Sequence, residues 1–326
     1  MEDLSVILEM ENASLFEWEE TEQAIENLMN EFIECKKTDQ DRHLELILVQ
    51  CGDDNDAENL KAKILEKCTD LTSYVSLLSF GIPNGRYYDL KNKGIEQASG
   101  DLVIFVDSDA PVEQGWLKEI TSPFSDPKMM VVNGHTYIAH STFMDRVYAL
   151  YWFFPLRQND DRKSSKRALN ANNSAFRRSW IQKNPFQHNP GFKMSCGMLW
   201  SKIVTQRIPN KSVKAFAAHA PPQGIRFFFW RSFTAGRDQD RRFAITKTAS
   251  KFKRCGHALS RFFTRTREAL VRTFSHYQEV GFTVWQAPFA FIVWTVFSLM
   301  FMMGQLGHVF ARSEKTEQLP DAIQIS

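Results

Sequence analysis

The sequence predicts an α/β fold built around a mainly parallel central sheet. Over roughly the first 140 residues, strand-like runs rich in Val, Ile and Leu alternate with helix-like runs. The run at 102–106 is apolar at five consecutive positions, as expected for a strand buried on both faces. A chain of 326 residues is also long enough to bury a large core. Alternating strands and helices form βαβ units, which place their strands in parallel.

The individual elements follow from the same patterns. Apolar residues recur at helical spacing within 14–37, and an alternating or continuous apolar run marks each strand. Ser99-Gly100 stands where a helix C-cap is expected, between a helix and a strand. The expected strands are 4–8, 44–52, 74–80 and 102–106, and the expected helices are 14–37, 57–67, 88–98 and 113–123.

The buried strand at 102–106 ends in two carboxylates, Asp107 and Asp109, which flank Ser108. Like charges this close raise one another's pKa unless a cation lies beside them. In open parallel sheets, ligands bind beyond the carboxyl ends of the strands. The pattern therefore predicts a ligand or metal site at this tip. The alternative is an ordinary acidic turn after a strand, where Asp is common.

Several classes of site are excluded by missing motifs. The chain has no GxGxxG and no GxxxxGK[ST] segment, so a bound phosphate would depend on a metal ion and basic side chains. The five cysteines are scattered and form no CxxC pair, which argues against a disulfide framework or a cysteine-based zinc site and fits a reducing compartment. The acidic start "MEDLSVILEM" is not a secretory signal.

The C-terminal part has a different character. Residues 282–310 contain no Asp, Glu, Lys or Arg, which predicts a single transmembrane helix, the alternative being a buried core helix. The preceding block is rich in arginine, so the positive-inside bias places the N-terminal domain in the cytoplasm. Residues 223–281 interleave aromatics with arginines, which favours helices on a membrane of anionic lipids over a nucleic-acid surface. A plain amphipathic helix on the domain remains the alternative.

The segment "DLKNKGIEQASGDLVIFVDSDAPVEQGWL" (89–117) resembles the core of the family 2 glycosyltransferases of the GT-A fold. That family has an Arg-Asn-x-Gly-Ile helix, Gly-Asp, an apolar strand and Asp-x-Asp in this order. Further segments agree in order and spacing, at 4–12, 44–56, 170–181 and 217–222. The implied organisation is a transferase domain at 1–222, a membrane-interface region at 223–281, a transmembrane helix at 282–310 and a tail at 311–326.

The resemblance implies transfer of a sugar from a nucleotide-diphosphate donor to a lipid-linked or envelope glycan acceptor, at the cytoplasmic face of the cell membrane. It also implies Mg²⁺ or Mn²⁺, held by one or two carboxylates plus the donor phosphates. The implied metal residues are Asp107, Asp109 and His219. The implied nucleotide-sugar residues are Glu9, Gln50, Asp53, Lys91, Asn92, Asp107 and Ser108.

The acceptor side departs from the family pattern. Inverting members carry a Glu-Asp pair some 25 residues before the late histidine, and its Asp acts as the general base. Here that region reads "GFKMSCGMLWSKI" (191–203), without a carboxylate. The acceptor-side candidates are Ser195, Cys196 and Asn172, although Cys196 is better interpreted as a small buried apolar residue. The alternative is therefore a non-catalytic GT-A protein that binds nucleotide sugars or acts as a scaffold.

Overall fold

The computed structural model describes residues 2–11, 18–154, 156–157, 169–187, 195–221, 224–247 and 249–311. The chain forms two compact units. Unit 1 comprises Met1–Thr136, Asp160–His188 and Ser195–His219, and unit 2 comprises Tyr137–Asn159, Asn189–Met194 and Ala220–Ser326. Of the predicted tail at 311–326, only Ala311 lies within the described residues.

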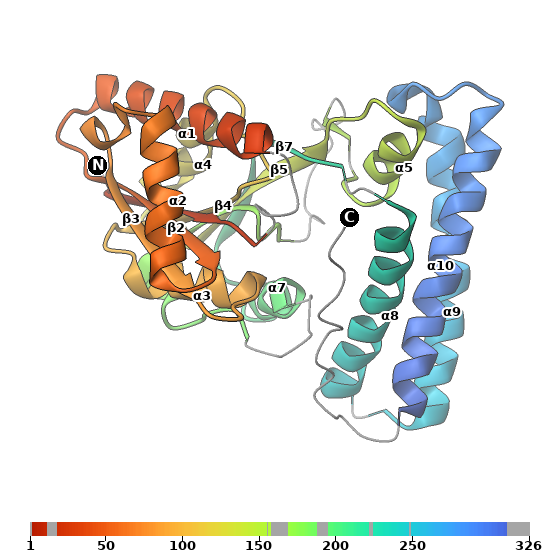
Figure 1. The fold of residues 1–326 in the computed structure, drawn as a ribbon. Coiled ribbons are helices and arrows are strands. Elements are labelled where there is room, and N and C mark those ends of the chain that lie inside the picture. Colours follow the sequence, from red (N-terminus) through yellow and green to blue (C-terminus); the bar gives the residue numbers. More distant parts are fainter. Residues whose placement is uncertain are drawn as a thin grey trace. The chain divides into compact units, whose positions relative to one another are not determined.

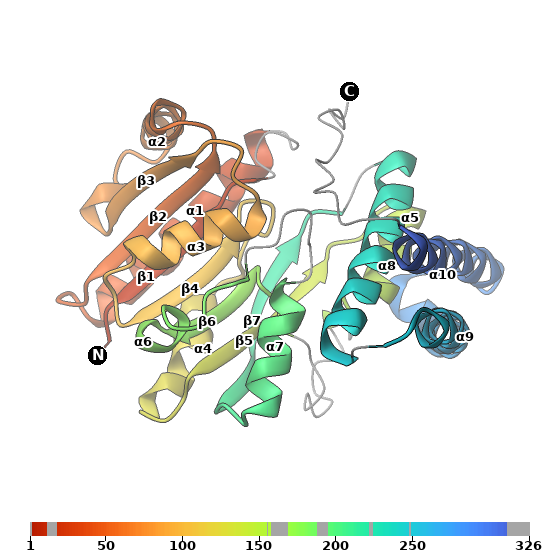
Figure 2. The same ribbon diagram turned by 90° about the horizontal axis from the view of Figure 1, so that it is seen from below.

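Unit 1 is built on a seven-stranded sheet with the strand order β3-β2-β1-β4-β6-β5-β7. The four strands at one side, β3 to β4 in this order, run parallel, whereas β6 is antiparallel to both β4 and β5. The mainly parallel sheet is thus confirmed (Figure 2). The strands are β1 (Leu4–Glu9), β2 (Leu44–Cys51), β3 (Ser76–Ile82), β4 (Leu102–Asp107), β5 (Val131–Ile138), β6 (Asn173–Arg177) and β7 (Asn210–His219).

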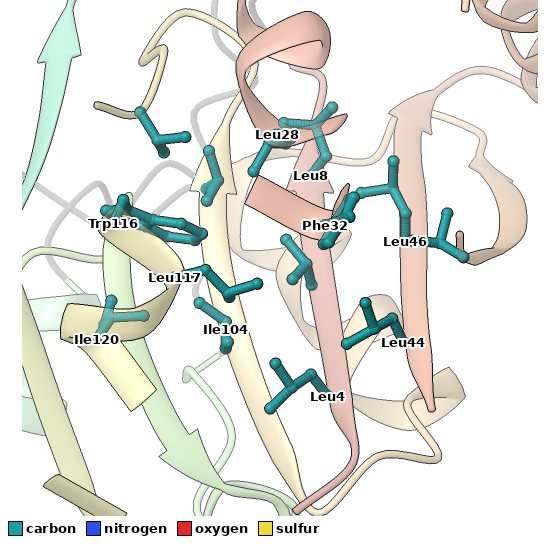
Figure 3. Packing of buried hydrophobic residues seen from close by; sticks show 14 of the residues in the cluster. Leu4, Leu8, Leu28, Phe32, Leu44, Leu46, Ile104, Trp116, Leu117 and Ile120 are labelled. Carbon is teal, nitrogen blue, oxygen red and sulfur yellow. The ribbon is translucent and has the colours of Figure 1, made fainter. Parts of the chain in front are cut away.

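Helices cover both faces of this sheet because the strands are apolar on both sides. One face packs against α1 (Trp18–Thr38), α2 (Asp54–Lys67) and α4 (Trp116–Thr121). The other face packs against α3 (Tyr87–Gln97), α6 (Arg178–Ile181) and α7 (Ser195–Thr205). Figure 3 shows the first of these interfaces, where strand leucines and Ile104 meet helix side chains that include Leu28, Phe32 and Trp116.

Two local predictions need correction. The helix predicted over 113–123 is shorter, since α4 ends at Thr121 and a 3₁₀ helix with Pro123 in its first turn follows (Ser122–Ser125). Gly100 is not a helix cap, because α3 ends at Gln97 with Ala98 as its C-cap. A Cβ on Gly100 would lie 2.7 Å from the Leu4 carbonyl carbon and the Ser5 nitrogen. Glycine is therefore required here for the close approach of two backbones.

Unit 2 is helical. It contains α5 (Phe143–Tyr151), α8 (Ile225–Lys247), α9 (Lys251–His276), a 3₁₀ turn (Tyr277–Val280) and α10 (Gln286–Phe310). The last three long helices lie side by side, with α10 packed against both α8 and α9 (Figure 1). Asp240 of α8 is fully buried and binds Arg254 of α9 and His308 of α10. This polar cluster joins the three helices.

The helix α10 falls within the apolar segment predicted at 282–310. It is the one helix among the described residues that is long and apolar enough to cross a membrane, with a mean hydropathy of 1.8 over its most apolar window. One stripe, including Trp294, Phe297 and Phe301, is buried within the unit. Other apolar side chains of α10, such as Phe289, Ile292 and Leu299, are exposed. The exposed stripe is what a membrane-facing helix would present.

Candidate functional site

Strand pairing brings two acidic side chains together at the carboxyl ends of β1 and β4. Glu9 and Asp107 are register partners in this parallel pair, and the Ser108 N–H donates to the Glu9 carbonyl at 3.0 Å. Glu9, Asp107 and Ser108 are each buried. Since the carboxyl ends of parallel strands form the usual ligand edge, these residues mark the edge predicted from the sequence.

The helix α3 supplies two partners to Asp107. Lys91 Nζ lies 2.6 Å from Asp107 Oδ1, and the Tyr87 hydroxyl donates to Oδ2 at 2.9 Å. Tyr87 and Lys91 are four residues apart, so they share one face of the helix. The Lys91 ammonium is completely buried and also lies 4.5 Å from the centre of the Tyr87 ring. Asp107 is thus held as the charged partner of a buried lysine.

The second carboxylate of the pair, on Glu9, has a different environment. Burial raises the pKa of Glu9 well above its usual 4.5, and the neighbouring Asp107 adds to the increase, whereas Lys91 opposes it. Its Oε1 accepts from the Glu11 N–H, and its Oε2 has no hydrogen-bond partner among the described residues. Burial and Asp107 also raise the pKa of Tyr87 well above 10. The two carboxylates at this edge thus differ: Asp107 is paired with Lys91, whereas Glu9 lies in surroundings that favour its protonated form.

Asp109 lies beyond this cluster and meets a residue from the far end of the sheet. His219 Nε2, at the end of β7, is 3.8 Å from Asp109 Oδ2. The approach follows from the backbone, because Val112 pairs antiparallel with Ala217 and the Glu113 N–H donates to the Phe216 carbonyl at 3.0 Å. Asp109 and His219, both named by the resemblance, are 110 residues apart in the sequence. The structure brings them together.

A carboxylate and an imidazole at this spacing suit a divalent ion whose remaining ligands come from a substrate. Mg²⁺ sites of nucleotide enzymes use one or two protein ligands plus phosphate oxygens, and Asp109 with His219 provides such a pair. Within the described residues no group of three or more His, Cys, Asp or Glu side chains could form an all-protein cage. Both oxygens of Asp107 already accept hydrogen bonds, from Lys91 and Tyr87, and each keeps a further acceptor position for a ligand.

The other residues named for the nucleotide sugar have mixed positions. Asp53 is the N-cap of α2, where it forms a capping box with Asp56. Gln50 lies near the end of β2 and is partly buried. The Asn92 amide is bonded in both directions to the backbone of Phe186, at 2.8 and 3.0 Å. Asn92 therefore fixes a loop, and we leave it out of the proposed donor site.

The acceptor-side candidates are all engaged in the fold. The Ser195 hydroxyl donates to the Gln187 carbonyl at 2.6 Å, and the Cys196 thiol contacts the Leu169 carbonyl at 2.9 Å. Burial raises the pKa of the Cys196 thiol to about 12, which removes it as a nucleophile or base at neutral pH. Asn172 accepts from the Thr136 hydroxyl at 3.1 Å. None of the three is placed as a general base.

Sequence reasoning missed Tyr87, the second partner of Asp107. Its position one helical turn before Lys91 was the available signal, since side chains four residues apart in a helix point the same way. The signal was weak because Tyr87 precedes the quoted motif and its role depends on a strand fifteen residues further along.

Comparisons with known proteins agree with this architecture. Residues 9–184 match the model of Glycosyl transferase family 2, and the chain belongs to this family. It is therefore a glycosyltransferase of GT-A fold, as the resemblance implied. A search of curated proteins gave no match.

Two solved structures show the likeness of fold. Mannosyltransferase PcManGT from Pyrobaculum calidifontis, in complex with GDP-Man and Mn²⁺, has a TM-score of 0.59 at 14% identity, covering 96% of this chain and 88% of that one. Mannosyl-3-phosphoglycerate synthase from Rubrobacter xylanophilus has a TM-score of 0.50 at 12% identity, covering 76% of each chain. At these identities the comparison establishes the fold.

Proposed function

We propose that this glycosyltransferase moves a sugar from a nucleoside-diphosphate donor with the help of Mn²⁺ or Mg²⁺ bound at Asp109 and His219. The observation that carries the proposal is their 3.8 Å approach at the ligand edge of a family 2 domain. The Mn²⁺ and GDP-Man found with the mannosyltransferase of like fold support the same pairing of ion and donor here.

The roles of the chain's own residues follow from the geometry. Asp109 and His219 would hold the ion, which when bound neutralises charge on the departing diphosphate. Asp107 and Ser108 would face the donor's ribose, with Lys91 and Tyr87 fixing the Asp107 carboxylate in one orientation. Glu9, Gln50 and Asp53 end the neighbouring strand and loop segments, so they complete the proposed nucleotide side.

We further propose that the acceptor is a lipid-linked or envelope glycan, with the catalytic unit on the cytoplasmic side of the cell membrane. Support comes from the apolar helix α10 and its exposed side chains, and from the arginine-rich sequence that precedes it. An acceptor confined to the same membrane would be enriched at the enzyme, which reduces the entropy cost of bringing the two together.

Donor turnover tests the metal site. Purified protein would be assayed for sugar release from a panel of nucleoside-diphosphate sugars, with Mn²⁺, with Mg²⁺ and with chelator. We expect turnover only with the divalent ion, and a loss of at least about 100-fold for Asp109→Asn, because electrostatic stabilisation of a leaving group supplies several kcal/mol. His219→Gln should lose less, since one ligand and the phosphates remain.

The matched control is Asp70→Asn, which makes the same chemical change at an exposed position. It should turn over as the wild type does. Equal turnover by Asp109→Asn and the wild type would refute the metal site. Ion-dependent donor binding without sugar release from any donor of the panel would favour the non-catalytic alternative.

A further inference from the structure

Unit 2 contains a cavity of about 500 Å³, and none of its lining residues belongs to the proposed donor site. Its lining comes from α8, α9, α10 and the end of α5 with the residues after it. Four arginines line it, Arg231, Arg261, Arg265 and Arg272, against a single carboxylate, Glu268. The volume is in the range of small-molecule sites. The excess of positive charge requires explanation, because like charges within one cavity repel.

Within the described part of the chain, no carboxylate forms an ion pair with any of the four arginines. Glu268 is near enough to offset part of the positive charge of Arg265 and Arg272. Buried Nε atoms of Arg261 and Arg265 have no hydrogen-bond partner in the same residues. Burial lowers the pKa of Arg265 to about 10, the nearby positive charges of Arg261 and Arg272 add to the decrease, and Glu268 opposes it. These guanidinium groups therefore have donors and charge available for an anion.

Aromatic rings also line the cavity and hold one arginine in place. The Arg265 guanidinium lies 4.3 Å from the centre of the Phe301 ring and 5.2 Å from that of Trp294. Arg272 is fixed by the carbonyls of Leu150 and Tyr151, 3.5 and 3.3 Å from its Nη1. Such cation–π contacts and carbonyl bonds pre-organise the guanidinium groups, which reduces the entropy cost of binding.

We propose that this cavity binds a phosphate ester. Planar guanidinium groups pair with phosphate oxygens through two parallel hydrogen bonds, so converging arginines are the usual recognition device. Two sources offer this chemistry: the headgroup of an anionic lipid and a water-soluble phosphate ester. The apolar wall formed by Trp294, Phe297 and Phe301 would accept the chain of a lipid beside its phosphate. The proposal concerns unit 2 alone and does not depend on the donor site.

The test is a binding titration of the full-length protein in a neutral detergent with three probes. Short-chain phosphatidic acid carries both phosphate and acyl chains, the matching diacylglycerol lacks the phosphate, and glycerol 3-phosphate lacks the chains. We expect phosphatidic acid to bind and diacylglycerol not to bind. Glycerol 3-phosphate binding as tightly as phosphatidic acid would assign the site to soluble phosphate esters, and weaker binding would assign it to a lipid headgroup.

Variants localise the binding. Arg261→Gln and Arg265→Gln should each weaken phosphatidic acid at least about tenfold, the usual cost of losing a charge-assisted hydrogen bond. The affinity of Arg265→Lys should lie between those of the wild type and Arg265→Gln, because lysine keeps the charge but lacks the planar guanidinium fork. Arg267→Gln is the control, an exposed arginine of the same helix outside the cavity lining. Should Arg265→Gln fail to fold, Arg261→Gln carries the test.

Two results would overturn the proposal. One is equal binding of phosphatidic acid and diacylglycerol, which would mean that the phosphate is not recognised. The other is the same affinity in Arg261→Gln, Arg265→Gln and Arg267→Gln. That result would assign these arginines only to a general interaction with a charged surface, with their stems along apolar residues.

Discussion

A lysine and a tyrosine bind the Asp107 carboxylate. The two aspartates of the Asp-x-Asp segment therefore lie in different environments. Asp107 is a buried ion-pair partner, while Asp109 meets His219. In a buried pair, the loss of one partner costs more than the pair itself contributes, because the remaining charge stays in an apolar environment. The chain's stability at this edge therefore depends on Lys91.

Replacing Lys91 with methionine tests this dependence. Lys91→Met leaves Asp107 charged beside Glu9 with only the Tyr87 hydroxyl as partner, and we expect a loss of about 3–5 kcal/mol in the free energy of unfolding. The measurement is urea denaturation. Lys93→Met on the same helix is the control and should change stability by less than about 1 kcal/mol. Equal losses of unfolding free energy in both variants would show that stability does not depend on the buried pair in particular.

The pH dependence of stability tests the environment of Glu9. Its raised pKa means that the folded protein holds a proton that the unfolded chain releases near pH 4.5. Stability should therefore fall as the pH rises from 4.5 towards the raised value of the folded state. Glu9→Gln cannot ionise, so this part of the decline should disappear. The check is unfolding free energy against pH, with exposed Glu66→Gln as the control, which should keep the wild-type profile.

At the scale of elements, the contact between α8 and α10 depends on two glycines. A Cβ on Gly236 would lie 1.9 Å from the Phe301 carbonyl oxygen, and a Cβ on Gly304 would lie 2.0 Å from the Phe233 oxygen. The two helices thus touch through their backbones at reciprocal points. Small residues at a helix crossing allow two backbones to approach this closely.

Alanine substitutions measure the importance of this crossing. Gly236→Ala and Gly304→Ala should each lower the unfolding free energy by about 1–3 kcal/mol, because the helices must move apart. Gly256→Ala on α9, where a Cβ would meet nothing within 4 Å, should be neutral or stabilising by about 0.5–1 kcal/mol. Thermal unfolding in detergent compares the three. A Gly236→Ala variant that unfolds at the same temperature as the wild type would contradict the close crossing.

The elements of unit 1 were largely predictable because each strand or helix is encoded by local periodicity. The buried strand at 102–106 became β4 with one additional residue, Asp107. Gly100 was misinterpreted because its role depends on the backbone of β1, far away in the sequence. Likewise, no local sequence pattern predicts that Lys91 and Tyr87 bind the two oxygens of Asp107. Contacts between distant elements decide such details; the resemblance named Lys91 and Asp107 as site residues but not the contact between them.

At the scale of the whole molecule, we propose that α10 spans the membrane. A charge at the centre of such a helix costs about 2.5–3.5 kcal/mol per residue. We therefore expect Ile292→Asp/Val296→Asp, at two exposed positions of α10, to release the protein from membranes. Alkaline carbonate extraction followed by sedimentation measures this. Val271→Asp, at an exposed position of α9, should remain in the pellet, and retention of the double variant would contradict a single span.

We propose above that Asp109 and His219 hold an ion that also binds the donor diphosphate. Pulsed electron paramagnetic resonance on Mn²⁺ added to the full-length protein with a nucleoside diphosphate tests this directly. We expect coupling of the manganese to imidazole nitrogen and to phosphorus in one complex. The nitrogen coupling should disappear in His219→Gln, and Asp109→Asn should lose most of the bound Mn²⁺. Phosphorus coupling without any nitrogen coupling in the wild type would contradict the site.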